Sequence, residues 1–150
     1  MSHTYSSLLV HAVFSTKERR PFITPEMTAR LTPYLGGIAR EHGMRALAIG
    51  GVEDHAHMLL SLPPTLSVSK AMQLIKGGSS KWIHDTFPSQ RRFAWQEGYG
   101  AFSIGIRNVG ETTEYINDQE AHHQKRNFKD ELVAFLRGHN IEFDERYLLG

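Results

Sequence analysis

The sequence predicts an α+β fold, with one antiparallel sheet that carries helices on one face and further helices at the C-terminal end. Three observations lead to this prediction. The chain has 150 residues, which suits a single domain spanning 1–150. Short apolar segments with strand-like character alternate with segments whose apolar residues recur at helical spacing. Turn and capping residues separate the two kinds of segment.

The first strand and the first helix follow each other directly. Residues 5–16 are rich in Leu, Val, Phe, Ser and Thr with rough alternation, and the charged segment 17–21 ends them. Thr24 has the position of an N-cap, and a proline follows it at the first helical position. We therefore predict a helix over residues 25–42, which Pro33 is expected to bend or restart.

A hairpin and a second helix come next. Residues 44–52 and 55–62 are two apolar runs separated by Glu53-Asp54, a pattern that favours an antiparallel hairpin. Ser67 is placed to cap a second helix, which closes before Pro88.

The remaining segments supply a fourth strand and two more helices. Residues 93–106 are interpreted as a loop leading into the strand. Asn108 and Glu111 resemble a capping box that opens a helix through residue 125, and a last helix covers 129–139. The resulting order of strand, helix, strand, strand, helix, strand is that of a ferredoxin-like or RNA-recognition-like sandwich.

The composition excludes several classes of protein. Hydrophobic residues make up 40% and charged residues 22%, as in soluble globular proteins. The absence of cysteine excludes disulfide scaffolds, thiolate metal sites and cysteine nucleophiles. No apolar run reaches the roughly 18 residues of a membrane span, and residues 1–5 do not begin a signal peptide, so we expect a cytoplasmic protein.

The charge is unevenly distributed along the chain. The formal net charge is only +1, yet residues 67–95 contain five basic residues and one acidic residue. From residue 111 to the end there are five basic and nine acidic residues. A polyanion bound on one side would suit this arrangement, although two ordinary solvated surfaces would also produce it. The candidate contacts are Lys70, Lys76, Lys81, Arg91 and Arg92.

His55 and His57 form the sharpest local feature. Residues i and i+2 of a strand project from the same face, so the two imidazoles stand side by side while Ala56 turns into the core. Such a pair is half a metal site. A surface strand without a ligand remains the alternative.

Tyr115 and Gln119 share one face of the predicted third helix, because they are four residues apart. A phenol is a poor nucleophile at its free pKa of about 10, but a divalent cation that polarises a phosphoryl oxygen can allow it to attack phosphorus. The structural alternative is a tyrosine that packs the helix onto the sheet.

The combination of these features resembles a known family. A His-hydrophobe-His strand, followed by a helix with Tyr and then Gln one turn later, resembles the HUH single-tyrosine transposases of the insertion-sequence 200/605 type. Four segments match in order, across nearly the whole chain, and these are residues 52–59, 75–82, 95–103 and 115–119.

The resemblance implies a role for each matching residue. His55 and His57 would be imidazole ligands of a divalent metal, Mg²⁺ or Mn²⁺, Gln119 its amide ligand, and Tyr115 the nucleophile. The implied reaction cleaves and rejoins single-stranded DNA through a 5′-phosphotyrosine intermediate. The implied partners are hairpin-containing element ends and a second copy of the chain, with active sites shared between the subunits of a homodimer.

Several other residues have a structural as well as a functional interpretation. Trp82 is expected in the core, and Asp54 is expected to make the hairpin turn rather than to orient a histidine. His122-His123 is interpreted as an exposed helix end, and Glu114 points away from Tyr115. Tyr99 is a candidate for stacking on an unpaired base.

Two other functions stay open at this point. One is a non-catalytic module that binds single-stranded nucleic acid, with the His pair and Tyr115 vestigial. The other is a metal-dependent hydrolase that activates water and leaves Tyr115 without a task. A covalent protein–DNA adduct would distinguish the transferase from both.

Overall fold

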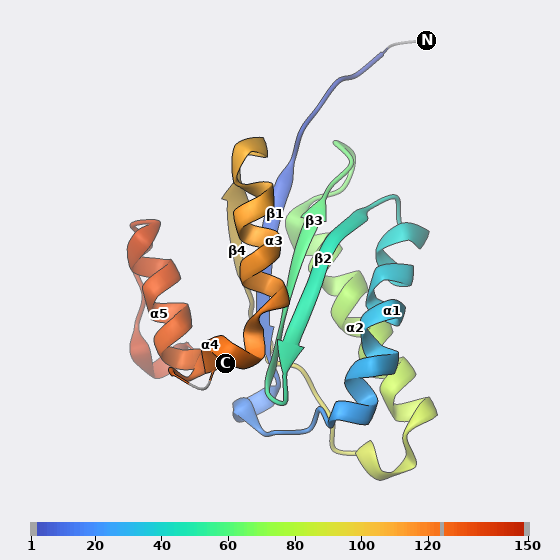
Figure 1. Cartoon of the computed structure of the whole chain (residues 1–150). Helices are drawn as coiled ribbons and strands as arrows, with labels where there is room; N and C mark the ends of the chain where they lie inside the picture. The colour runs from blue at the N-terminus through green and yellow to red at the C-terminus, as the bar shows by residue number, and fades with distance from the viewer. Residues whose placement is uncertain (1–2, 124, 149–150) are drawn as a thin grey trace.

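A four-stranded antiparallel sheet runs through the centre of the molecule, in a computed structural model that describes residues 3–123 and 125–148 (Figure 1). The order of its strands is β2-β3-β1-β4, and each neighbouring pair is antiparallel. The strands are β1 (Leu9–Ser15), β2 (Arg45–Val52), β3 (His55–Ser61) and β4 (Gly100–Ile104). This confirms the predicted α+β class.

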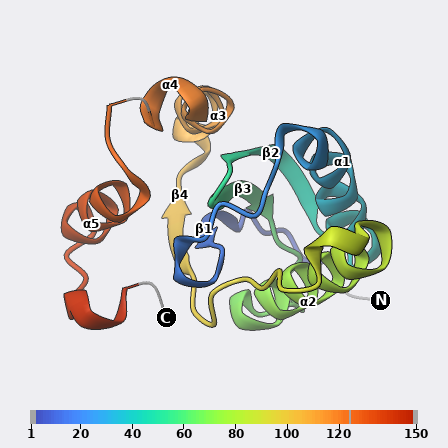
Figure 2. The ribbon, with the colours of Figure 1, turned by 90° about the horizontal axis from the view of Figure 1, so that it is seen from below.

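Two long helices, α1 (Pro25–Glu41) and α2 (Val68–Thr86), cover one face of the sheet (Figure 2). The side chain of Thr24 caps α1 by accepting a hydrogen bond from the Met27 amide, and Ser67 caps α2 in the same way. The helix does not restart at Pro33, because α1 continues through it as one helix, and the alternative of a bend at this residue stays a prediction.

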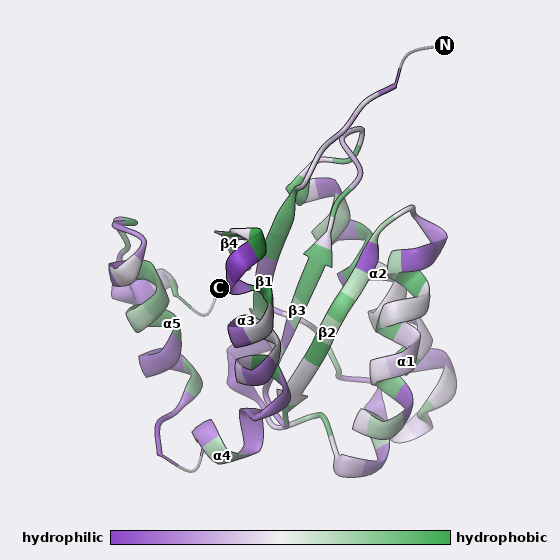
Figure 3. Cartoon of the chain, turned by 45° about the horizontal axis from the view of Figure 1, so that its top comes forward, coloured by the Kyte–Doolittle hydropathy of each residue, from purple (hydrophilic) through white to green (hydrophobic). Residues whose placement is uncertain are grey.

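The main hydrophobic core lies between these helices and the sheet. Phe14, Met58 and Leu60 point into it from the strands and meet Leu35 and Ile75 of the helices. The strands are accordingly hydrophobic along most of their length (Figure 3). The core side chains of β3 alternate with side chains that point to the opposite face, which is where the functional candidates lie.

The opposite face carries α3 (Val109–Asn117), α4 (Gln119–His123) and α5 (Phe128–Gly138), so the C-terminal helices form a second layer (Figure 2). The prediction of a single third helix over 108–125 is wrong, because the helix is interrupted at Asp118. Residue 124 lies outside the described residues. The break turns α4 away from the axis of α3.

The predicted capping box of α3 is also wrong. A short 3₁₀ turn, Ile106–Asn108, precedes the helix and leaves Asn108 with a turn-like backbone (φ −98°, ψ 2°). An N-cap needs an extended backbone to direct its side chain at the first amides, and Asn108 makes no such hydrogen bond.

The first strand starts at Leu9 rather than at Tyr5, which is 92% exposed. Strand-like composition does not suffice outside the paired part of the sheet, which begins at Leu9. Among the described residues, no helix is long and apolar enough to cross a membrane.

Candidate active site

The face of the sheet beneath α3, α4 and α5 carries buried histidines. His11 comes from β1, and His55 and His57 come from β3. As predicted, the two β3 histidines share one face of the sheet while Ala56 joins the main core on the other. Buried imidazoles need polar partners, and the C-terminal helices supply them.

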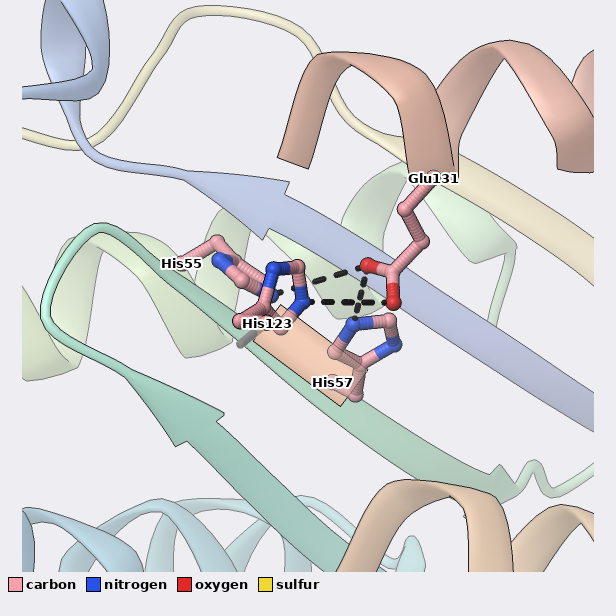
Figure 4. A group of neighbouring side chains, drawn as sticks. All are labelled: His55, His57, His123 and Glu131. Atoms are coloured by element: carbon pink, nitrogen blue, oxygen red, sulfur yellow. Dashed lines mark hydrogen bonds and ion pairs between the residues drawn. The ribbon is translucent and has the colours of Figure 1, made fainter. Parts of the chain in front are cut away.

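Glu131 of α5 is the centre of this polar group (Figure 4). Its side chain is fully buried, and its Oε1 lies 2.9 Å from Nε2 of His57 and 3.6 Å from Nε2 of His55. Its Oε2 lies 3.3 Å from Nε2 of His123, on α4. Potential ligand atoms of His55, His57, His123 and Glu131 all lie within 4.8 Å of one another.

Gln119 also reaches the histidines. Its Oε1 lies 3.2 Å from Nε2 of His55 and 3.0 Å from Nε2 of His123, while its amide nitrogen donates to the Tyr115 carbonyl. Gln119 is the first residue of α4 and faces the sheet because the helix is interrupted at Asp118. Its side chain is therefore buried. The predicted ligands His55, His57 and Gln119 are therefore brought together.

Tyr115 lies beside the same cluster. Its hydroxyl donates a hydrogen bond to Oε2 of Glu131. Its ring stands edge-on to His57, with centroids 5.9 Å apart, and stacks on His122 at 4.4 Å. One carboxylate thus connects the histidines to the candidate nucleophile.

Burial and hydrogen bonding set the charges of the site. Burial disfavours the charged form of Glu131, but hydrogen bonds from His123 and His57 hold its pKa well below the usual range, so the carboxylate is ionised. Burial lowers the pKa of His57 to about 4, which keeps this imidazole neutral. Burial, together with the hydrogen bond to Glu131, raises the pKa of Tyr115, so the free phenol stays protonated at neutral pH.

Second partners orient the two β3 imidazoles. Nδ1 of His55 donates to Oδ1 of Asp54 at 2.7 Å, which leaves the Nε2 lone pair directed at the cluster. The interpretation of Asp54 as a turn residue alone was therefore wrong. Nδ1 of His57 lies 2.8 Å from Nε2 of His11, whose pKa is lowered to about 3 by burial, so His11 is a neutral partner.

The donor set fits a divalent cation. It offers three imidazole nitrogens, one amide oxygen and one ionised carboxylate, all buried or nearly so. Separations near 3 Å between potential ligand atoms suit groups that share one cation at about 2.1 Å. Imidazole and carboxylate together suit Mn²⁺ better than Mg²⁺, which prefers oxygen ligands.

A glycine in β2 allows α3 to lie directly on the sheet. A Cβ atom at Gly50 would stand 2.1 Å from the carbonyl oxygen of Ile116. Ile116 is itself fully buried against Ala48 and Leu59. Gly50 pairs with His57 in the sheet. The contact therefore holds α3, and with it Tyr115, above β3 close to His57.

The five predicted DNA contacts lie elsewhere. Lys70, Lys76 and Lys81 are on α2, which packs on the sheet face opposite to the histidines, and Arg91 and Arg92 follow it. Lys76 donates to the carbonyls of Glu97 and Gly98, and Lys81 pairs with Asp85 at 3.0 Å. The structure does not bring these residues to the candidate active site.

Trp82 and Tyr99, two aromatic residues singled out in the sequence, lie on or near α2. Trp82 is only partly buried and stacks on Tyr34 at the edge of the main core, with ring centroids 4.4 Å apart. Tyr99 is 38% exposed beside the ammonium group of Lys76. Its role in stacking on a base stays a prediction.

Sequence reasoning missed Glu131, His123 and His11. The interpretation of His122-His123 as an exposed helix end was wrong, because the break at Asp118 turns His123 inward and His122 packs on Tyr115. A signal for Glu131 was present, since it falls on the apolar face of its helix with Phe128 and Leu132. A carboxylate on a buried helix face requires partners, and those partners are the histidines.

Comparisons with known proteins relate the chain to transposases. Residues 4–119 match the family described as "Transposase IS200 like". The transposase for insertion sequence element IS200 of Salmonella typhimurium is 31% identical over 124 residues, covering 79% of this chain and 81% of that protein. The ISDra2 transposase TnpA of Deinococcus radiodurans is 25% identical over 114 residues, covering 73% of this chain and 81% of that protein.

Solved structures share the fold. A crystal structure of a protein from Deinococcus radiodurans superposes with a TM-score of 0.66 at 22% identity, covering 79% of this chain and 95% of the other. A REP-associated tyrosine transposase bound to a REP hairpin superposes with a TM-score of 0.59 at 16% identity, covering 82% and 74%. By its family match and its IS200 relative, the chain belongs to the IS200-like transposases.

Proposed function

We propose that this transposase cleaves and rejoins single-stranded DNA by transesterification, with Tyr115 as the nucleophile. The observation that carries the proposal is the contact of the Tyr115 hydroxyl with Glu131, whose carboxylate also faces the histidine cluster. Neither a binding module nor a hydrolase needs a phenol in this position.

The proposed step is a displacement at phosphorus. The Tyr115 oxygen attacks the phosphodiester, the bond from phosphorus to the 3′ oxygen breaks, and a 3′-hydroxyl leaves. The product is a 5′-phosphotyrosine, and Glu131 is placed to take the phenolic proton because its Oε2 already accepts the hydrogen bond. Since the intermediate retains the ester bond, another 3′-hydroxyl can reverse the step and join two strands.

His55, His57 and Gln119 would hold Mg²⁺ or Mn²⁺, with His123 and Glu131 within reach of the same cation. The cation, when bound, would stabilise the negative charge that develops on the phosphate. The side chains of the protein supply the remaining functions. They orient the nucleophile, shield it partly from solvent and position the proton acceptor.

The DNA partner is proposed from the relatives and the charge. One structural relative is bound to a REP hairpin, which supports hairpin-containing element ends as the substrate here. The five basic residues named above would contact phosphates away from the reacting bond. We also propose a homodimer, as the family resemblance implies, but with each active site complete in one chain, because Tyr115 and the histidines already meet there.

A covalent adduct is the direct test. The protein is incubated with Mn²⁺ and labelled single-stranded DNA that carries the ends of its own genomic element, and the products are separated on a denaturing gel. We expect a DNA band shifted by covalently attached protein. Cleaved DNA without an adduct would favour hydrolysis, and binding without cleavage would favour the non-catalytic module.

Tyr115→Phe is the matched variant, since it removes one hydroxyl and keeps the ring that stacks on His122. We predict that it abolishes the adduct while DNA binding is retained, because the nucleophilic oxygen alone is lost. A gel-shift titration run beside the denaturing gel measures both properties. An adduct that persists in this variant would assign the nucleophile to another residue.

A further inference from the structure

A cavity of about 350 Å³ opens beside Tyr115, between β4, the start of α3 and α5. Tyr115 and His11 form part of its wall, so the cavity adjoins the candidate active site. The mechanism proposed above does not use its remaining residues. Its volume lies within the range of small-molecule sites, which begins at roughly 300 Å³.

Aromatic rings form much of the wall. Phe135 of α5 stacks on Phe102 of β4, with centroids 5.3 Å apart and planes 25° from parallel. The ring of His139 lies 4.8 Å from Phe102 and is exposed. Since Phe102 is 2% exposed, the rings open to a base are those of Phe135, which is partly buried, and His139. Aromatic faces of this kind stack on unpaired bases of any sequence.

Polar groups stand at the start of α3. Asn108 and Glu111 line the cavity and are exposed, and their spacing of three residues places them on one side of the helix. The amide of Asn108 makes no capping hydrogen bond, so it can donate and accept at a base edge. The carboxylate of Glu111 accepts hydrogen bonds and repels phosphate.

We infer that this cavity binds one unpaired nucleobase next to the phosphate that Tyr115 attacks, an inference that rests on the proposed function. Because Tyr115 is part of the cavity wall, the base of a nucleotide bound at this residue has the cavity beside it. Glu111 accepts from the exocyclic amino group of cytosine, adenine or guanine, whereas the one donor of thymine, its N3–H, is flanked by two carbonyl oxygens that repel a carboxylate. The cavity therefore prefers an amino-bearing base over thymine.

Binding of short probes tests the inference without catalysis. Trinucleotides of deoxycytidine, deoxyadenosine and thymidine are titrated, in the absence of metal, into ¹⁵N-labelled full-length protein. We expect the cytosine and adenine probes to shift the backbone amides of residues 102–112, and the thymine probe to bind there about tenfold more weakly. Shifts confined to other elements, or equal affinity for all three probes, would overturn the inference.

Two variants sharpen the result. Glu111→Gln, at an exposed position, should reduce the preference for cytosine over thymine to near unity, whereas Glu114→Gln, exposed on the same helix outside the cavity wall, should not change it. Phe135→Leu should weaken all three probes about tenfold by removing a stacking surface. If Glu111→Gln keeps the preference for the cytosine probe over the thymine probe, the carboxylate does not select the base. This result does not depend on whether Phe135→Leu folds.

The adduct assay separates this inference from the proposed function. Probe binding in the cavity without any covalent adduct would retain the nucleobase site and reject the catalytic proposal. Adducts formed on a pool of random single-stranded DNA can be sequenced at the nucleotides that flank the attached phosphate. Random flanking bases, together with unshifted cavity amides, would reject the nucleobase site and retain the catalysis.

Discussion

Glu131 is the residue on which the chemistry of the site depends. Among the described residues it is the only carboxylate whose oxygens lie with the potential ligand atoms of His55, His57 and His123, and it also accepts a hydrogen bond from the Tyr115 hydroxyl. Its ionised form is stabilised by the imidazoles around it, so the site contains a fixed negative charge that the expected ligands His55, His57 and Gln119 do not provide. A fixed charge of this kind attracts a cation and keeps the nucleophile next to it.

We predict that Glu131→Gln weakens Mn²⁺ binding by at least tenfold and slows adduct formation by more than that. The substitution preserves the shape of the side chain, removes its charge and removes the proton acceptor for Tyr115. Calorimetric titration with Mn²⁺ measures the first effect, and single-turnover adduct assays measure the second. Asp130→Asn makes the same chemical change at the exposed neighbouring position and should alter neither.

Metal affinity equal to that of the unmodified protein would place the cation on other ligands. A slower adduct with unchanged metal affinity would leave Glu131 as a positioning residue for Tyr115 alone. Circular dichroism of both variants shows whether the fold is retained, which is a necessary control because Glu131 is fully buried.

At the scale of elements, the arrangement of α3 on β2 determines where Tyr115 lies. The two backbones approach so closely at Gly50 and Ile116 that no side chain fits between them. The neighbouring break at Asp118 then directs Gln119 and His123 at the sheet. The site is thus built by one close contact and one interruption of a helix.

Gly50→Ala should therefore affect both stability and activity. The added Cβ would meet the Ile116 carbonyl at 2.1 Å, so α3 must move. We expect a loss of stability of about 1–3 kcal/mol and an adduct rate lowered at least tenfold, because a small displacement of a nucleophile is costly. Thermal denaturation and single-turnover assays measure these effects.

Gly37→Ala is the matched control, since a Cβ at Gly37 meets nothing within 4 Å and lies in a helix interior. It should leave activity unchanged and stability equal or higher. An active Gly50→Ala protein with normal stability would show that α3 tolerates displacement and does not fix Tyr115.

The same elements explain how far the sequence could predict the site. The prediction that His55 and His57 project from the same face of the sheet followed from strand periodicity, which depends on local geometry alone. The break at Asp118 depends on tertiary contacts of Gln119 and His123, so helical periodicity wrongly continued one helix to residue 125. Glu131 lies 16 residues from Tyr115, and only the packing of α5 reveals that they meet.

At the scale of the whole molecule, the basic residues and the candidate active site lie in different layers. The sheet separates α2 from the histidine cluster, so a bound strand that contacts both must pass around an edge of the sheet. The sequence predicted the charge imbalance but not this separation, because linear proximity carries no information about sheet faces.

The salt dependence of binding tests whether DNA reaches the basic segment. Replacing both Arg91 and Arg92 with alanine should reduce the slope of log affinity against log salt by about 1.4 on single-stranded DNA, or roughly 0.7 for each lost phosphate contact. Arg40→Ala combined with Arg45→Ala removes two exposed arginines elsewhere and should leave the slope unchanged. Equal slopes for all three proteins would exclude Arg91 and Arg92 from the DNA path.

Whether one chain or two form an active site can be decided by mixing inactive variants. Tyr115 contacts Glu131 and the edge of His57 within one chain, so we predict that each site uses its own tyrosine. Tyr115→Phe lacks the nucleophile and His57→Ala lacks a proposed ligand, and both should be inactive alone.

In a mixture refolded together, sites complete in one chain give no adduct, since every chain has one defect. Sites shared between subunits would regain a functional pair in each mixed dimer, formed by the tyrosine of one variant and the histidines of the other. A denaturing gel of the mixture, beside each variant alone and a size measurement of the assembly, distinguishes these outcomes. An adduct found only in the mixture would show that α3 is exchanged between subunits, so that Tyr115 of one chain acts with His57 of the other.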